Sequence, residues 1–555
     1  MKTTSLTQQE REVIALNDSL GRYLESLSTG RAATPRSWLY EGDPTPEVTL
    51  DNWMRILGRL KTGTEYEREV YQFDISQLEK WGPQGQVAPL EDLMPIVEEG
   101  FMLADSKKPP VFNSQEWQDA KEATFWDLNA FSLRPASYQH VLDDMRARDT
   151  LESNSGWPLF QRRNSKEVVA ASISDAEDGS WKRYPAIALF RNYNQKTRLV
   201  WMFPMSTNLV EGSFFQPLQS AIIKSRTSWK WKGVFAPWFG FEACRKEITQ
   251  VYRDMAGVHK NDPNRTVAAS DFASTDAHFT IWHTLEVYDI IKHCFQKQYW
   301  TALRESLVHM HSIPLVIGKD SQLAGLHGVS SGSNWTNFVE TIFDIAFGHY
   351  VALTVGQHAP GGPITYQQER TILDSDFMAK CMYAIGDDMT WLCDRYDEKF
   401  AELLEEAGRE VGHVIKAEKT TNYYNKVKTL QRLFQRGYNR PDSQCRGVYS
   451  TVRALKSSVY PERFHKPKLW SSDMFCARQF MILENCVDHP LFEEFVQFVC
   501  RGQKDLIPFA KNPASKLKTI TRETKLLPGF NPTYNQEKRD QALSTFQSVD
   551  VIRSM

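Results

Sequence analysis

The stretch Cys381-Met382-Tyr383-Ala384-Ile385-Gly386-Asp387-Asp388-Met389-Thr390-Trp391-Leu392 places an acidic turn between two short apolar runs. Apolar runs on both sides of a tight turn predict a β-hairpin with Gly-Asp-Asp at its tip. Two adjacent carboxylates are hard oxygen ligands, which favour Mg²⁺ or Mn²⁺ over softer metals. An ordinary acidic turn is the alternative. It is favoured for the tripeptide alone, which arises by chance in roughly one chain of this length in ten.

Length and composition restrict the possible functions. At 555 residues the chain is long enough for a large core and several subdomains. Its net charge of −2 excludes nucleic-acid binding through bulk positive charge, so such binding depends on local clusters of Lys and Arg. The eight cysteines form no CxxC pair, which favours reduced thiols over a disulfide framework or a zinc ribbon. No apolar run approaches about 18 residues, so no membrane span is expected.

Two further carboxylates can join the hairpin. Asp271 ends the run Thr266–Ser270, whose small and β-branched residues predict a strand, and Asp276 follows in the first turn of a predicted helix. One carboxylate at a strand end and two at a hairpin tip can converge on adjacent strands of one sheet. A two-metal phosphoryl-transfer site needs this arrangement. For Asp271 alone, a helix N-cap is the alternative.

Two segments supply candidate contacts for nucleotides. The strand-like runs 186–191 and 199–204 flank a basic turn that contains Lys196 and Arg198, where phosphates could bind. The small-residue loop 328–337 precedes a long apolar helix, and its backbone N–H groups could contact a nucleotide. Taken alone, this loop is better interpreted as an ordinary helix cap.

Three other patterns are weaker. The turn Ser155-Gly156-Trp157-Pro158 precedes two arginines, and a solvated loop explains it equally well. Lys419 is either a surface cation or a proton donor to a leaving pyrophosphate. The mixed apolar and basic run 429–436 predicts a strand, and the leucines within residues 1–30 predict an amphipathic helix.

In chain order, these segments resemble the motifs of viral RNA-dependent RNA polymerases, most like those of picobirnaviruses and next like those of partitiviruses. The resemblance covers residues 150–440. It rests on Ser155-Gly156-Trp157-Pro158 as motif G, Lys196-x-Arg198 as motif F, Asp271-x4-Asp276 as motif A, Ser331-Gly332-x3-Thr336 as motif B, Gly386-Asp387-Asp388 as motif C, Lys419 as motif D and Leu430-Gln431-Arg432 as motif E. Each motif alone is weak, whereas seven in polymerase order are a strong signal.

The resemblance implies a role for each residue. Asp271, Asp387 and Asp388 would bind two Mg²⁺ or Mn²⁺ ions, with Asp388 assisting, and Lys419 would be the general acid. The nucleotide would be bound by Arg191, Lys196, Arg198, Asp276, Ser331, Gly332, Thr336 and Asn337, and the template by Ser155, Gly156 and Pro158. Asp276 and Thr336 would sense the ribose 2′-hydroxyl, which distinguishes RNA from DNA substrates. The loop around Ser331 and Gly332 would shift to admit template and nucleotide.

One position departs from the pattern of many positive-strand RNA virus polymerases, in which an Asn stands four residues after the motif B Thr. Here that position is Glu340, and Asn337 lies one residue after Thr336. An acidic residue there fits the double-stranded RNA virus branch.

The implied fold is α/β, of the α+β kind. It is a right-hand polymerase with fingers, palm and thumb in a closed ring, whose palm is an antiparallel sheet flanked by helices. The expected division is 1–130 as an N-terminal extension bridging fingers and thumb, 131–204 and 280–327 as fingers, 205–279 and 328–440 as palm, and 441–555 as thumb and C-terminal tail.

The implied function is RNA-directed RNA synthesis that replicates and transcribes a viral, double-stranded RNA genome. The partners would be template and nascent RNA, ribonucleoside triphosphates and a viral capsid protein, in the virion interior and the host cytoplasm. A reverse transcriptase-like polymerase is one alternative, opposed by Asp276, where an aromatic residue usually blocks the 2′-hydroxyl, and by Gly386, where Tyr-x-Asp-Asp is usual. A non-catalytic, RNA-binding, capsid-associated protein is the other. It gives no reason for the carboxylates to align with Lys419 and Arg198.

Overall fold

The computed structural model describes residues 1–147, 150–225, 233–253, 265–358, 382–393, 396–525, 527, 530 and 541–555, with the side chains of 356–358 excluded. The chain forms two compact units. The first comprises Met1–Gly30, Ala88–Phe190 and Leu199–Val427, and the second comprises Arg31–Val87, Arg191–Arg198 and Lys428–Met555. Cys381, the first residue of the hairpin stretch, lies outside the described residues.

A four-stranded antiparallel sheet in the first unit carries the predicted acidic hairpin. Its strand order is β7 (Met382–Ile385), β8 (Asp388–Cys393), β4 (Thr266–Asp271) and β9 (Thr421–Asn422). The hairpin is confirmed: β7 and β8 are joined by the two-residue turn Gly386-Asp387, in which Gly386 has the left-handed φ of 57°. A residue without a Cβ adopts that conformation without strain.

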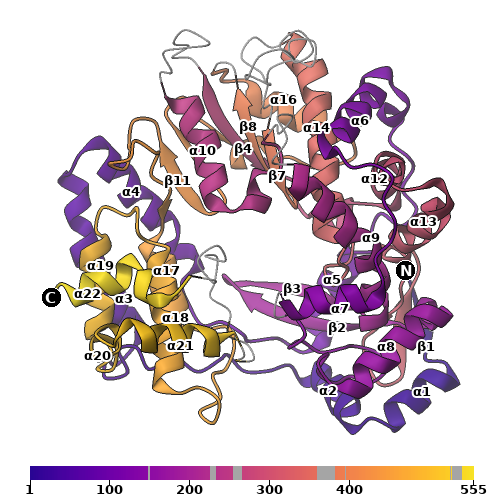
Figure 1. The fold of residues 1–555 in the computed structure, drawn as a ribbon, viewed down its shortest axis with the longest axis horizontal. Helices are drawn as coiled ribbons and strands as arrows, with labels where there is room; N and C mark the ends of the chain where they lie inside the picture. Colours follow the sequence, from indigo (N-terminus) through magenta and orange to yellow (C-terminus); the bar gives the residue numbers. More distant parts are fainter. Residues whose placement is uncertain are drawn as a thin grey trace. The chain divides into compact units, whose positions relative to one another are not determined.

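Helices cover this sheet (Figure 1), so its expected helical flanks are confirmed. Contacts join α14 (Thr336–His358) to β7, α10 (Phe241–Tyr252) to β4, and α16 (Phe400–Glu410) to β9. The segment Thr336–Val355 of α14 is long and apolar enough to cross a membrane, but 94% of its residues are buried inside the protein. A core helix with apolar residues on all sides explains that composition.

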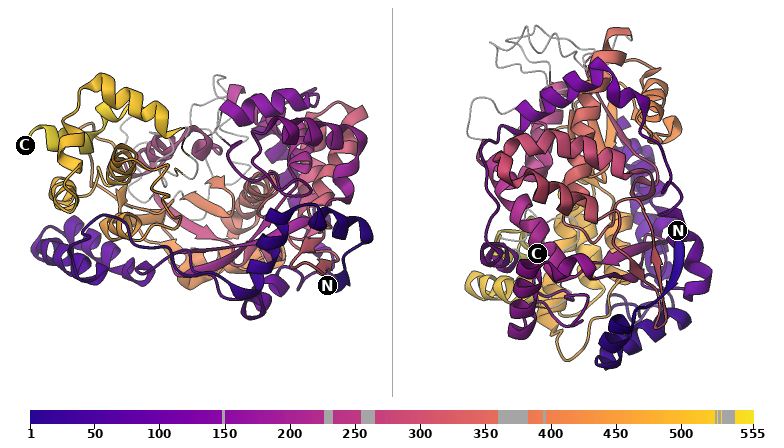
Figure 2. Two further views of the ribbon diagram at one scale, coloured as in Figure 1. Left: turned by 90° about the horizontal axis from the view of Figure 1, so that it is seen from below. Right: turned by 90° about the vertical axis from the view of Figure 1, so that its right-hand side faces the viewer.

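A second sheet is mixed and has five strands, in the order β1 (Lys2–Ser5), β6 (Ser321–Ala324), β5 (Leu315–Val316), β2 (Ala186–Tyr193) and β3 (Lys196–Met202). The N-terminal strand β1 pairs antiparallel with β6, so the N-terminus lies along one edge of this sheet (Figure 2). The turn between β2 and β3 lies at Asn194-Gln195, whose φ values are 55° and 61°. The prediction of a turn at Lys196 and Arg198 was therefore wrong, because both cations lie on β3.

The expected single helix over residues 1–30 was also wrong. After β1 the chain forms α1 (Gln8–Ala15) and α2 (Asp18–Thr29). The break lies at Asn17, whose side chain accepts a hydrogen bond from the Leu20 N–H and caps α2. The other helices of eight or more residues in the described part of the first unit are α5 (Leu90–Glu99), α6 (Gln115–Leu128), α7 (Tyr138–Ala147), α8 (Lys166–Asp178), α9 (Met205–Lys224), α12 (Ile281–Ile291) and α13 (Trp300–His309).

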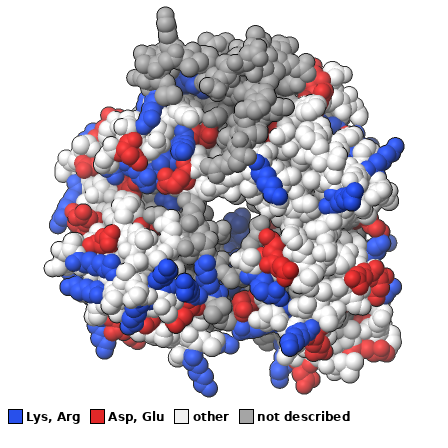
Figure 3. Space-filling model, in the orientation of Figure 1, with Lys and Arg blue, Asp and Glu red and all other residues white. Residues whose placement is uncertain are grey.

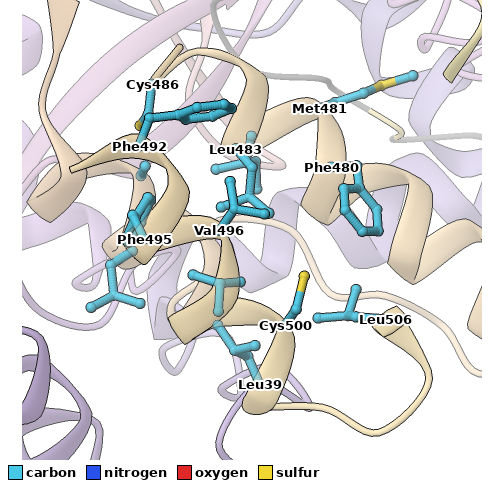
Figure 4. Packing of buried hydrophobic residues seen from close by; sticks show 14 of the residues in the cluster. Leu39, Phe480, Met481, Leu483, Cys486, Phe492, Phe495, Val496, Cys500 and Leu506 are labelled. Atoms are coloured by element: carbon cyan, nitrogen blue, oxygen red, sulfur yellow. The ribbon is translucent and has the colours of Figure 1, made fainter. Parts of the chain in front are cut away.

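The second unit is mostly helical, as expected for the C-terminal region. Its helices are α3 (Pro46–Leu57), α4 (Glu65–Ser76), α17 (Thr451–Val459), α18 (Ser472–Glu484), α19 (Phe492–Arg501), α20 (Leu506–Ala510), α21 (Ala514–Thr524) and α22 (Gln547–Arg553). Figure 4 shows their shared core, in which Leu39 lies with Phe480, Phe495 and Cys500. Residues 31–87 of the predicted N-terminal extension belong to this unit, so the first 130 residues contribute to both units.

A small sheet accompanies these helices, with strand order β10 (Lys426–Thr429), β11 (Arg432–Gln435) and β12 (Val448–Tyr449). The predicted single strand over 429–436 was wrong. Leu430 and Gln431 have φ values of 48° and 65° and form a turn between β10 and β11. The seven described cysteines (Cys244, Cys294, Cys393, Cys445, Cys476, Cys486 and Cys500) are buried, and no disulfide bond joins any two of them.

A buried carboxylate connects the N-terminal and C-terminal parts of the second unit. Asp74 on α4 accepts hydrogen bonds from Ser450 (2.5 Å) and Thr451 (3.0 Å) at the start of α17. It also accepts one from His489 Nε2 (2.8 Å), whose Nδ1 accepts from the Leu491 N–H. Three side chains distant in sequence therefore depend on one carboxylate that is fully buried.

We predict that Asp74→Ala destabilises the second unit by about 3 kcal/mol, because it leaves buried donors without an acceptor. Urea denaturation followed by tryptophan fluorescence would measure this loss. Asp51→Ala on the exposed face of α3 is the control, with an expected change within about 0.5 kcal/mol. Equal unfolding midpoints for the two variants would contradict the prediction.

Candidate active site

The strand register brings two of the predicted metal ligands together. Asp271 on β4 pairs directly with Asp388 on β8. Directly opposite residues of antiparallel strands lie about 4.5–5.5 Å apart at their Cα atoms. Both side chains are exposed, whereas every other residue of the two strands is buried. The pair therefore lies at the open end of two strands that are otherwise buried.

The third carboxylate, Asp387, is held at the hairpin tip by neighbouring elements. The Thr275 hydroxyl, in α11 (Thr275–His278) just after β4, donates to Asp387 Oδ2 at 2.8 Å. On the other side of the turn, the Gly386 N–H donates to Thr341 Oγ1 of α14 at 2.8 Å. The turn is thus fixed by hydrogen bonds to two helices, so Asp387 has a defined position at the site.

Further carboxylates lie beneath the hairpin on α14. Glu340 and Asp344 are one helical turn apart and both are buried. Burial, and then repulsion from Asp387 and other nearby carboxylates, raises the pKa of Glu340 and of Asp344 well above the usual range. The Asp388 side chain has exposed surface. Even so, loss of solvent to the surrounding protein, and then repulsion from Asp387 and Asp271, raises its pKa to about 7.

These residues fit divalent cations. Both Asp344 oxygens are buried, and among the described residues no group donates a hydrogen bond to them. The clustered carboxylates repel one another, and a cation bound nearby would reduce that repulsion. Within the described ranges, no three His, Cys, Asp or Glu side chains are already arranged as ligands.

The predicted ribose-reading residues differ in their availability. The Thr336 side chain is buried, and its hydroxyl donates to the Ser330 carbonyl at 2.6 Å. Asn337 is exposed, and its amide reaches the hairpin: a Cβ on Gly386 would lie 2.8 Å from Asn337 Nδ2. Asp276 is also exposed in α11, and its charge acts on Glu340. Asn337 and Asp276 are therefore better placed than Thr336 to contact a ligand.

The loop before α14 packs tightly on β3. A Cβ on Gly332 would lie 1.6 Å from the Trp201 carbonyl oxygen, so only glycine fits there. The adjacent Ser331 Oγ accepts a hydrogen bond from the Trp201 N–H at 3.3 Å. The predicted motif B loop is thus in contact with the strand that carries the predicted motif F cations.

The predicted template turn is also packed against the end of β3. Ser155 is buried, and its carbonyl accepts a hydrogen bond from the Met205 N–H at 2.8 Å. Gly156 has a φ of 68°, and a Cβ there would lie 2.6 Å from the Phe203 carbonyl oxygen. Pro158 follows a cis peptide bond to Trp157.

The remaining predicted cations are in two places. Arg191, Lys196 and Arg198 belong to the second unit, in which Arg191 forms a bidentate ion pair with Glu462, with both N–O distances at 2.7 Å. Lys196 and Arg198 are exposed and lie two residues apart, hence on the same face of β3. Lys419 is exposed at the end of a short 3₁₀ helix that leads into β9, the neighbour of β4.

Bulk charge does not mark a nucleic-acid surface. On the face shown in Figure 3, Lys and Arg are interspersed with Asp and Glu, in keeping with the net charge of −2. Contacts with an anionic polymer must therefore be local, as the sequence predicted.

Sequence reasoning missed several residues of the site: Thr275, Thr341 and Asp344. Asp344 was detectable, since it is an acid four residues after Glu340 in an otherwise apolar helix. Thr275 and Thr341 gave no signal. Their roles depend on hydrogen bonds to the hairpin turn, which follows them by 112 and 45 residues in the chain.

Comparisons with known proteins agree with this geometry. Residues 193–462 match the family model described as viral RNA-dependent RNA polymerase. A "potential RNA-dependent RNA polymerase" of human picobirnavirus (strain Human/Thailand/Hy005102/-) is 26% identical over 507 residues, which cover 88% of this chain and 86% of that protein.

Two solved structures share the fold. The crystal structure of the RNA-dependent RNA polymerase of a human picobirnavirus is 23% identical, covers 99% of this chain and 100% of that one, and gives a TM-score of 0.79. An insertion-loop deletion mutant of a human picobirnavirus polymerase is 22% identical, with the same coverage and a TM-score of 0.77. The expected right-hand polymerase fold is thereby confirmed. The chain thus resembles picobirnavirus polymerases in sequence and in fold, and its residues 193–462 match the viral RNA-dependent RNA polymerase family.

Proposed function

We propose that this polymerase replicates and transcribes a viral, double-stranded RNA genome by two-metal-ion nucleotidyl transfer. The observation that carries the mechanism is the register of β4 and β8, which places Asp271 opposite Asp388 with Asp387 at the adjoining turn. The similarity to picobirnavirus polymerases supports the wider assignment. No specific observation favours a reverse transcriptase-like polymerase or a non-catalytic RNA-binding protein.

Asp271 and Asp387 would hold two divalent ions, Mg²⁺ or Mn²⁺, with Asp388 assisting. When bound, such ions lower the pKa of an attacking hydroxyl and stabilise the charge that develops on the transferred phosphorus and the leaving oxygen. Thr275 orients the Asp387 carboxylate through its hydroxyl. The buried acids Glu340 and Asp344 add negative potential beneath the hairpin and so favour cation binding.

The substrates are RNA and ribonucleoside triphosphates, which the polymerase family implies. In this proposal Lys196, Arg198 and Arg191 neutralise the nucleotide phosphates, and Arg191 exchanges Glu462 for a phosphate. Lys419 donates a proton to the leaving pyrophosphate. The loop at Ser331 and Gly332, with Thr336, Asn337 and Asp276, accommodates the ribose, and Ser155, Gly156 and Pro158 guide the template.

The domain assignment is part of the proposal. Residues 131–204 and 280–327 would form the fingers, 205–279 and 328–440 the palm, and 441–555 the thumb with the C-terminal tail, while 1–130 bridge fingers and thumb into a closed ring. The distribution of residues 1–130 over both compact units supports a bridging role. We also propose action in the virion interior and the host cytoplasm, with a viral capsid protein as partner.

The central test is templated ribonucleotide incorporation. We predict that Asp387→Ala lowers incorporation by about 10³-fold or more. A bound metal ion contributes several kcal/mol of transition-state stabilisation, and each 1.4 kcal/mol that is lost lowers the rate about tenfold. Asp388→Ala should lose less, because Asp388 only assists. The assay uses single- and double-stranded RNA templates without primer, in Mg²⁺ and in Mn²⁺. Asp105→Ala, at an exposed position of the first unit, is the control. Undiminished incorporation by Asp387→Ala would refute the mechanism.

A second prediction concerns sugar selection. Asn337→Ala should reduce the preference for ribonucleotides over deoxyribonucleotides by about tenfold, the effect of losing one hydrogen bond to the 2′-hydroxyl. Thr336→Val should change this preference less, since the Thr336 hydroxyl is engaged by the Ser330 carbonyl. Single-nucleotide incorporation gives kcat/KM for both nucleotide types. A larger loss in Thr336→Val than in Asn337→Ala would reverse the assignment.

A further inference from the structure

A buried carboxylate on α9 holds the loop that precedes α14. Glu211 has 1% of its side chain exposed. Its carboxylate accepts hydrogen bonds from the Ser333 hydroxyl and from the Asn334 N–H, the latter at 3.1 Å. These two residues lie just before α14, whereas Glu211 belongs to α9. A side chain of one helix thus accepts hydrogen bonds from donors at the start of another helix.

Asn208, one turn earlier on α9, extends the same network. Its side-chain amide donates to Glu211 Oε1 at 2.9 Å and to the Gly332 carbonyl at 3.1 Å. Its own carbonyl accepts from Asn334 Nδ2 at 3.1 Å. Three consecutive loop residues, Gly332 to Asn334, are therefore bonded to two side chains of α9 or to its backbone.

Arg163 connects this network to the predicted template turn. Its Nη2 donates to Asn208 Oδ1 at 2.8 Å, and its Nε donates to the Asn154 carbonyl at 3.0 Å, one residue before Ser155. Burial lowers the pKa of Arg163 to about 10, while the charge of Glu211 works against that change. Arg163, Asn208 and Glu211, here termed the α9 junction, thus contact the template turn and the nucleotide loop at once.

These polar groups are unusual for their location. The N-terminal half of α9 is almost wholly buried, yet it carries Asn208 and Glu211. Burial raises the pKa of Glu211 to about 7. The hydrogen bonds from Ser333, Asn208 and Asn334 and the charge of Arg163 act in the opposite direction and lower it. An apolar side chain would fill this space at a lower free-energy cost than a buried carboxylate. The role of Glu211 is therefore to accept hydrogen bonds from its donors.

We infer that the α9 junction is a positioning device that couples the template turn around Ser155 to the nucleotide loop around Gly332. Glu211 and Asn208 fix the loop, and Arg163 transmits the position of the template turn to Asn208. None of the three contacts the Asp271, Asp387 and Asp388 carboxylates through any described bond. The inference rests on the proposed polymerase function and adds a positional coupling within that site.

The test is a double-mutant cycle on templated incorporation by the full chain. Arg163→Ala removes the template side of the junction, and Ser333→Ala removes one donor on the loop side. Each should raise the KM for the incoming nucleotide about three- to tenfold with little change in kcat, the range of typical coupling between sites. The double variant should raise KM by less than the product of the single effects, since both act through Asn208 and Glu211.

The matched control is Arg162→Ala, whose guanidinium is exposed and pairs with Glu152 instead of the junction. It should leave the nucleotide KM unchanged and combine multiplicatively with Ser333→Ala. Glu211→Ala should raise KM as well, whereas Glu211→Gln should restore it, because an amide can still accept from Asn334 and donate to the Ser333 oxygen. If Glu211 had only a structural role, Glu211→Ala would lower kcat and stability together. It would not raise the nucleotide KM, and Glu211→Gln would not restore that KM.

Two outcomes separate the inference from the proposed function. If the wild-type protein incorporates ribonucleotides and Asp387→Ala does not, but Arg163→Ala and Ser333→Ala act multiplicatively, the coupling is refuted and the polymerase function stands. If Asp387→Ala retains full incorporation, both are refuted. Should Glu211→Ala fail to fold, the cycle on Arg163 and Ser333 decides the question, since neither substitution removes the buried carboxylate.

Discussion

The site depends on one electrostatic constraint: two like charges held opposite each other at the end of adjacent antiparallel strands. Directly opposed carboxylates repel, and Asp271 and Asp388 can remain so placed only because the rest of β4 and β8 is buried and paired along its length. Burial first, and then repulsion from Asp387 and from Asp271, raises the pKa of Asp388. A divalent cation relieves this repulsion, so the same geometry that costs stability in the free protein favours metal binding.

Helix α14 holds the acidic hairpin in place. It presents Thr341 to the hairpin turn and buries Glu340 and Asp344 beneath it, while most of its other described side chains are packed in the core. Its first residues continue from the loop that contacts β3 and α9. One rigid element therefore connects the proposed metal ligands, the residues proposed to contact the ribose and, through the α9 junction, the turn proposed to guide the template. Rigid elements position such groups more accurately than loops do.

Much of the site was predictable from local patterns. The hairpin followed from two apolar runs around Gly-Asp-Asp, and the strand before Asp271 from its small and β-branched residues. Turn positions were less predictable. The cations Lys196 and Arg198 suggested a turn, but the left-handed residues are Asn194 and Gln195, and a similar error placed a strand across Leu430 and Gln431. Charge does not set backbone conformation, whereas tolerance of positive φ does.

The sequence by itself determined which residue types are present, their order and the local elements that carry them, because those depend on neighbours within a few positions. Only the tertiary structure decided that Asp271 faces Asp388, that Asn337 and not Thr336 has a free side chain near the turn, and that Glu211 holds Ser333. Strands β4 and β8 are more than 100 residues apart, and a shift of their register by one residue would move every side chain to the other face of the sheet. Such a register is fixed by burial and helix packing summed over the whole unit, which no local pattern contains.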